Sequence, residues 1–188
     1  MKKILIIDIE TTGFLNAGGK IIEIGIVELD LQDGSRKMLV DELVYEDGLT
    51  YHDMGKAWIV SNSDIKPMDV MQAQNLKSVQ ASIQQVINDY PLGATAFNNT
   101  FDFGFMEDRG FSFPVKLACP MKLSTDICKL KGRYPGKYKW PKVQEAYDFF
   151  FGKTDYVEKH RGADDAMHEA KIIYELYKRG IFKLNKEV

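Results

Sequence analysis

Residues 3–9 read KILIIDI, a nearly continuous apolar run that is followed by a turn signal, TTG. A run of this kind is typical of a central strand covered on both faces. Such a strand must lie between other layers of structure, so this segment constrains the architecture more than any other stretch of the chain. Two acids, Asp8 and Glu10, stand one residue apart at its end.

The segments that follow predict a mixed sheet. Residues 19–30 and 36–47 are rich in β-branched residues and are joined by short turns, which predicts an antiparallel meander with the first strand. Residues 45–69 are irregular and predict a loop with short helical turns. Residues 74–90 have apolar side chains at helical spacing. Residues 93–98 follow this helix, so a right-handed crossover predicts a strand parallel to the first.

Helices dominate the remainder of the chain. Residues 100–110 predict a short helix that stops at Gly110. Three further helical stretches are interrupted by a segment rich in glycine and proline; they are residues 123–130, 141–151 and 163–179. This order of strands, crossover and helices predicts an α/β fold with helices packed against a mixed sheet.

The composition limits the class of protein. The 188 residues with 45% hydrophobic content suit one compact domain over residues 1–188. A net charge of -2 means that any binding of nucleic acid must use a local basic patch. Cys119 and Cys128 do not have metal-site or disulfide-framework spacing, and no signal-peptide core or membrane span is evident. We therefore expect a soluble cytoplasmic protein.

Asp8 and Glu10 project from the same face of their predicted strand, because strand side chains alternate. Two neighbouring carboxylates repel each other, and burial makes the repulsion more costly. One interpretation is a solvent-exposed strand end with two capping acids. The other is a site for a divalent cation, which takes oxygen ligands and cancels the repulsion. This pair alone does not decide between them.

Further acids fall on predicted buried faces. Asp102 lies in the middle of the apolar face of its helix, where a carboxylate needs a partner. In the last helix, periodicity places Asp165 beside the buried stripe and Asp164 on the opposite face. His160 precedes this helix in a loop, close in sequence to the inward-facing acid. His52 and His168 lack such neighbours, and we expect both at the surface.

With these residues in place, the sequence resembles the DEDDh branch of the DnaQ-like 3′–5′ exonucleases, a group that includes proofreading subunits and RNase T-like enzymes. The segment IDIETTG is similar to the first motif of the family, NNTFDFGFM to the second, and HRGADDA to the third. The resemblance covers nearly the whole chain. It departs from the family at Phe97, where many proofreading members have histidine, and at Gly162, where alanine is frequent.

The resemblance implies a ribonuclease H-like fold, with a five-stranded mixed sheet and helices on both sides. It also implies that two Mg²⁺ or Mn²⁺ ions support phosphodiester hydrolysis. The catalytic general base would be His160. The metal ligands would be Asp8, Glu10, Asp102 and Asp165. The product would be a 5′-mononucleotide released from the 3′ end.

Candidate substrate contacts follow from the same resemblance. They are Thr11, Thr12 and Phe14 at the turn after the first strand, and Asn98 before the second motif. Residues 129–142 contain six cations, no acid and three aromatic residues, a composition suited to phosphate contacts and base stacking. The alternative is a solvated lysine-rich loop with Trp140 in the core.

The leading hypothesis is a metal-dependent exonuclease acting on single-stranded or frayed DNA ends. An exoribonuclease or short-oligonucleotide nuclease is the first alternative. The second is a non-catalytic nucleic-acid-binding module associated with a polymerase, although all five motif positions are filled. The pattern excludes a phosphatase with an aspartyl nucleophile, because the first motif of such an enzyme would require a second aspartate at the position of Glu10. The sequence leaves open whether the chain acts alone or serves a DNA polymerase in proofreading during DNA replication.

Overall fold

A computed structural model describes residues 2–184, which contain a five-stranded sheet in the order β4-β3-β2-β1-β5. The strands β1 (Lys3–Thr11), β2 (Ile21–Asp30) and β3 (Arg36–Tyr45) form the predicted antiparallel meander. The short strand β5 (Ala94–Thr95) runs parallel to β1, also as predicted. The two-residue strand β4 (Gln74–Asn75) pairs in parallel with β3, where the sequence predicted the start of a helix.

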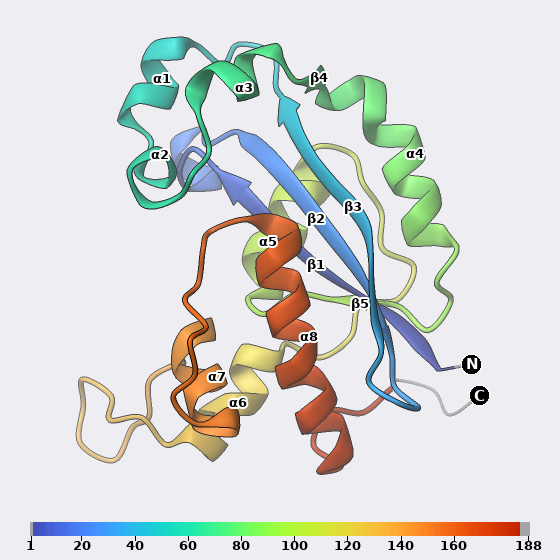
Figure 1. Ribbon diagram of the computed structural model, residues 1–188, viewed down its shortest axis with the longest axis vertical. Helices are drawn as coiled ribbons and strands as arrows, with labels where there is room; N and C mark the ends of the chain where they lie inside the picture. The colour runs from blue at the N-terminus through green and yellow to red at the C-terminus, as the bar shows by residue number, and fades with distance from the viewer. Residues whose placement is uncertain (1, 185–188) are drawn as a thin grey trace.

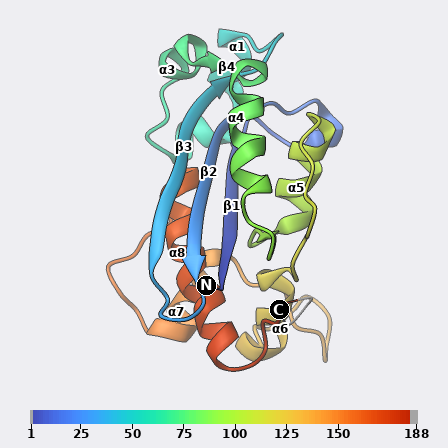
Figure 2. The ribbon, with the colours of Figure 1, turned by 90° about the vertical axis from the view of Figure 1, so that its right-hand side faces the viewer.

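Helices cover both faces of the sheet, which confirms the predicted fold class. Figure 2 shows α4 (Leu76–Asn88) and α5 (Asn99–Asp108) on one side of the strands and α8 (Gly162–Lys178) on the other. The helices α6 (Pro120–Cys128) and α7 (Val143–Phe151) pack into the same apolar cluster as α8.

The segment between β3 and β4 contains short helices, in agreement with the short helical turns predicted for it. It contains α1 (Tyr51–Lys56), α2 (Trp58–Asn62) and α3 (Pro67–Gln72). These helices, at the top of Figure 1, form a small apolar cluster with Ile22 of β2 and the end of β3. A further turn of 3-10 helix, η1 (Leu15–Ala17), follows the turn after β1.

The alternation of side chains along β1 divides the core into two layers. Ile4 and Ile6 pack under α8, whereas Leu5, Ile7 and Ile9 pack against α4 and α5. Asp8 and Glu10 continue the series of Ile4 and Ile6, because strand side chains alternate. Both acids are therefore on the α8 side of the sheet and are half-buried.

The start of α8 lies directly on the backbone of β2. A Cβ atom added at Gly25 would be 2.1 Å from the carbonyl carbon of Gly162. A Cβ atom at Gly162 would be 3.0 Å from the carbonyl oxygen of Asp8. Both positions require glycine because any side chain would push the helix away from the sheet. This close approach sets the first turn of α8 against the end of β1.

Among residues 2–184, no helix is long and apolar enough to cross a bilayer. Cys119 and Cys128 are both buried free thiols.

Candidate active site

The open edge of β1 positions Asp102. Because β5 pairs only with Leu5 and Ile6, the edge of β1 has no strand partner beyond that point among residues 2–184. The backbone N–H of Ile9, between the two acids of β1, instead donates a hydrogen bond of 3.3 Å to Oδ1 of Asp102. The Asp102 side chain from α5 thus reaches the same end of the strand as Asp8 and Glu10.

The first turn of α8 positions Asp165. Its carboxylate accepts hydrogen bonds from the backbone N–H of Arg161 at 3.0 Å and of Lys159 at 3.3 Å. The hydroxyl of Tyr156 donates a third bond, of 3.3 Å. Asp165 therefore fixes the loop before α8 while one side of its carboxylate lies near Glu10. One ligand atom from each of Glu10, His160 and Asp165 lies within 4.8 Å of the others.

An ion-pair network anchors the same loop to the sheet. Arg161 donates to Oε1 of Glu23 at 2.7 Å and to Asp64 at 2.8 Å. The other oxygen of Glu23 accepts a bond of 2.8 Å from the N–H of Gly162. Glu23 is fully buried and lies opposite Glu10 in the β1–β2 register. The network holds the residue before Arg161, His160, over the end of β1.

Burial and mutual repulsion disfavour the charged form of these acids. Burial, together with Glu169, Glu10 and other carboxylates, raises the pKa of Asp8 well above its usual value. Burial raises the pKa of Glu10 to about 9, and Asp165 and Glu23 add to this rise. Burial likewise raises the pKa of Asp102 to about 7, against the lowering effect of the Ile9 hydrogen bond. Ionising these acids together would concentrate negative charge at one end of β1, so without a cation they tend to keep their protons.

These residues fit divalent cations. No lysine or arginine in the described part of the chain forms an ion pair with Asp8, Glu10, Asp102 or Asp165. A set of carboxylate oxygens with one imidazole nitrogen is a donor set for hard or borderline cations such as Mg²⁺ and Mn²⁺. Bound cations would supply the missing positive charge and would return the carboxylates to their ionised form.

Sequence reasoning missed one acid in this cluster. Glu169 is 2% exposed and lies one helical turn after Asp165 on α8. Within residues 2–184, its Oε2 has no hydrogen-bond partner. Burial and the neighbouring Asp102 and Asp165 raise the pKa of Glu169 well above its usual value. The i, i+4 spacing from Asp165 was the available signal, since residues four apart share a face of a helix.

The structure separates the four candidate substrate contacts. Phe14 is 71% exposed, and with Asn98 it lines a groove of about 540 Å³ that also includes Phe101 and Trp140. Thr11 instead donates a hydrogen bond to the carbonyl of Gly13, which stabilises the turn. Thr12 accepts a bond from the N–H of Lys20. The two threonines do not line the aromatic groove.

The basic segment, residues 129–142, forms a loop that projects from the body of the molecule in Figure 1. Trp140 is 61% exposed, so the alternative that placed it in the core is wrong. Lys139 forms an ion pair with Glu145, which neutralises one of the six cations of this segment. Trp140 lines the same groove as Phe14.

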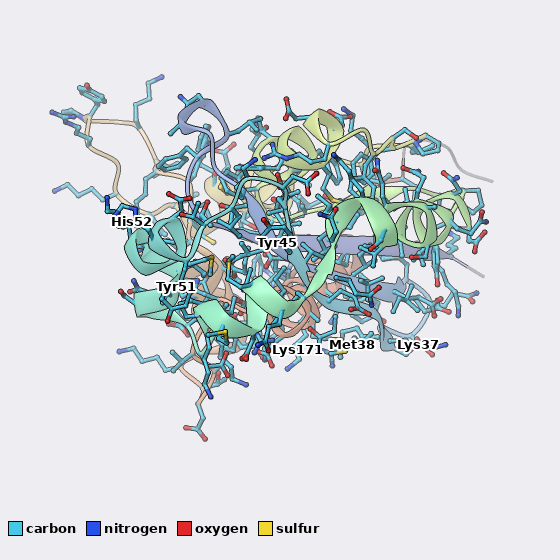
Figure 3. The ribbon with its side chains drawn as sticks, turned by 90° about the horizontal axis from the view of Figure 1, so that it is seen from above. Lys37, Met38, Tyr45, Tyr51, His52 and Lys171 are labelled. Carbon is cyan, nitrogen blue, oxygen red and sulfur yellow. The ribbon has the colours of Figure 1, made fainter. Side chains whose placement is uncertain are left out.

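The other acids and histidines near the site have different environments. Asp165 is 3% exposed, whereas Asp164 is half-buried and pairs with Lys159, in agreement with the predicted periodicity. His52 is exposed on α1 at the periphery of the molecule, as expected (Figure 3). The expectation that His168 lies at the surface is wrong, because its ring stacks on Tyr156 at 3.9 Å and is half-buried.

The family model that matches this chain and one of the similar solved structures both describe exonucleases. A family model described as exonuclease, of the RNase T type, matches residues 5–173. A search of curated proteins found no significant match. Among solved structures, a full-length 3′-exonuclease is 16% identical with a TM-score of 0.69, and the match spans 100% of this chain but 64% of that protein.

Two further structures are similar. The nuclease domain of 3′hExo, described as a DEDDh family member bound to rAMP, is 16% identical with a TM-score of 0.68; the match covers 100% of this chain and 98% of that one. Pop2p of S. pombe, in a form with Mg²⁺ and Mn²⁺, is 14% identical with a TM-score of 0.60. That match covers 94% of this chain and 83% of Pop2p.

Proposed function

Because the chain belongs to the DEDDh exonuclease family, we propose that it releases 5′-mononucleotides from the 3′ ends of single-stranded or frayed nucleic acid. The observation that supports this most directly is the convergence of acids from three elements with His160 at one end of β1. The aromatic groove beside this cluster offers a surface for an unpaired base.

Each residue has a role in the proposed reaction. Asp8, Glu10, Asp102 and Asp165 would hold two divalent ions, Mg²⁺ or Mn²⁺. Such ions would supply activation of the attacking water and stabilisation of charge on the leaving oxygen. A ring nitrogen of His160 takes the proton of the attacking water as the new phosphorus–oxygen bond forms and the bond to the 3′ oxygen breaks. Phe14 and Trp140 stack on the terminal bases, and Asn98 orients the 3′ end from the start of α5.

The nature of the sugar is a separate part of the proposal. DNA is the substrate expected from the sequence. An exoribonuclease is the second candidate, and the likeness to a nuclease domain described with bound rAMP favours it. A polymerase partner, a role in proofreading and a cytoplasmic location remain expectations that rest on the sequence alone.

The decisive experiment compares matched DNA and RNA oligonucleotides of one sequence, each labelled at the 5′ end, incubated with the purified protein and Mn²⁺. We expect a ladder that shortens from the 3′ end, with the faster substrate identifying the sugar preference. The variant Asp102→Asn should bind the oligonucleotides without shortening them. If the unaltered protein also binds both oligonucleotides and shortens neither, the chain is a non-catalytic binding module.

A further inference from the structure

Trp58 contacts the side chain of His160, although the two residues lie far apart in the sequence. The centroids of the two rings are 4.8 Å apart at an interplanar angle of 74°, an edge-to-face arrangement. Trp58 belongs to α2, which lies outside all three sequence motifs, and its side chain is 61% exposed. A tryptophan that serves only for packing is usually largely buried. Because Trp58 is mostly exposed, its contact with His160 needs another explanation.

The contact is the main constraint on the His160 ring. Among residues 2–184, no residue forms a hydrogen bond with the His160 side chain, whereas Nδ1 of His168 is fixed by the carbonyl of Asp164 at 2.7 Å. An aromatic contact orients an imidazole while both of its nitrogens stay available for water and protons. This is a suitable arrangement for a proton acceptor, because a hydrogen-bonded nitrogen would be occupied.

The backbone at His160 also needs support. His160 has a φ of 55°, in the left-handed region that residues other than glycine rarely adopt. On its C-terminal side, Arg161 ties the backbone to Glu23 of β2 and to Asp64, just beyond α2. The backbone is therefore held by an ion-pair network, and the ring by the indole. Figure 1 shows α2 on the same side of the sheet as the loop that leads into α8.

We infer that Trp58 is a positioning residue for the reaction: its indole holds the imidazole of His160 in the orientation needed to accept a proton. This inference rests on the proposed role of His160 as the general base. It assigns to α2 a function in turnover that is distinct from the binding of metal or substrate. An error of about 1 Å in the position of a catalytic group costs up to about a hundredfold in rate.

The first experiment tests the contact itself, without any activity measurement. The protein has three histidines, so His160 can be assigned among their ring proton signals in an NMR spectrum by comparison with His160→Ala. The indole should displace the His160 signals through its ring current. Trp58→Ala should return those signals toward the values of a free histidine. If the His160 signals are the same in both proteins, the contact is absent in solution and the inference is wrong.

The second experiment separates positioning from binding. Trp58→Ala should lower kcat about tenfold or more, while KM and the affinity for Mn²⁺ measured by calorimetry stay within about twofold. Trp58→Phe, which keeps an aromatic edge, should recover most of the rate. A matched control is Trp140→Ala, which removes an indole that is also 61% exposed but lies in the aromatic groove. That variant should raise KM and leave the His160 signals unchanged.

The outcomes distinguish this inference from the proposed function. A raised KM with an unchanged kcat in Trp58→Ala would make Trp58 a substrate contact and overturn the inference. A kcat unchanged in Trp58→Ala but greatly reduced in His160→Ala would also overturn it, while the proposed function would stand. An unchanged kcat in His160→Ala would reject the role of His160 itself. Melting curves of each variant show whether the fold is retained.

Discussion

His160 differs from Asp102 and Asp165, whose carboxylates accept hydrogen bonds from the backbone of neighbouring segments. Its side chain has no hydrogen-bond partner among the described residues, so its loss removes a proton acceptor and little else. We expect His160→Ala to lower kcat by about 10²- to 10⁴-fold, the usual contribution of a general base. The melting temperature and the affinity for Mn²⁺ should change little, as measured by a thermal melt and by calorimetry. Loss of Mn²⁺ binding would instead identify His160 as a ligand, which its place near Glu10 and Asp165 also allows.

In the described part of the chain, Glu169 is a buried acid with no cationic partner and with no hydrogen-bond donor for one of its oxygens. Its charge also raises the pKa of Asp8, second only to burial. Glu169→Gln keeps the shape and removes the charge. We expect a melting temperature in EDTA that is higher by about 2–4 °C, which corresponds to about 1 kcal/mol in a chain of this size. The matched control is Glu42→Gln on the exposed side of β3, which should leave the melt unchanged. A lower melting temperature for Glu169→Gln would mean that its carboxylate is needed for the fold.

At the level of elements, the position of Asp165 depends on the contact between α8 and β2. A methyl group at Gly25 would overlap the backbone of Gly162 and Ala163 at 2.1 Å. We expect Gly25→Ala to lower the free energy of unfolding by about 1–3 kcal/mol and to weaken Mn²⁺ binding, because the first turn of α8 must move. Chemical denaturation and calorimetry measure the two effects.

The control for this substitution is Gly104→Ala, at a helical position in α5 with open space around it. It should be neutral or stabilise the protein by up to about 1 kcal/mol, since alanine favours helix. Equal behaviour of the two variants would show that the contact between α8 and β2 is not as close as described.

The basic loop of residues 129–142 is a second element with a testable role. Lys137 is exposed, and Lys139 is partly neutralised by Glu145. Replacing both lysines with alanine should flatten the dependence of log Kd on log salt for a single-stranded oligonucleotide by about 0.7–1.4, one to two phosphate contacts. Fluorescence anisotropy at several salt concentrations measures the slope. Lys37→Ala, on β3, is the control (Figure 3). An unchanged slope in the double variant would exclude the basic loop from the binding surface.

The elements that the sequence predicted well are those with local signals. The meander, the crossover helix and the parallel β5 follow from periodicity and from short connections. The three short helices were not predicted individually, because they are held by a small cluster of distant contacts rather than by their own periodicity. The strand β4 was not predicted, because its two polar residues are defined by pairing with β3. The burial of Asp165 rather than Asp164 followed from helical spacing. The Arg161–Glu23 pair and the Trp58–His160 contact join residues far apart in the chain, so no local pattern indicates them.

The whole molecule combines these features into a dependence of stability on pH. The pKa of Asp102 is raised to about 7 and that of Glu10 to about 9, whereas unfolded carboxyl groups lose their protons near pH 4. Between the unfolded pKa of about 4 and these raised folded pKa values, the folded protein binds more protons than the unfolded chain. The free energy of unfolding therefore falls as the pH rises through this range. In EDTA, the melting temperature should therefore fall between pH 6 and pH 9.

Divalent metal should act in the opposite direction, because Mg²⁺ and Mn²⁺ bind the ionised carboxylates and compete with protons. The gain in melting temperature on adding Mn²⁺ should therefore grow as the pH rises over the same range. The variant Asp102→Asn lacks one of the raised carboxyl groups, so its melting temperature in EDTA should fall less steeply. A metal-free melt that stays level or rises toward pH 9 in the unaltered protein would mean that these acids are ionised without metal. In that case the folded chain would have to neutralise them by contacts other than those described.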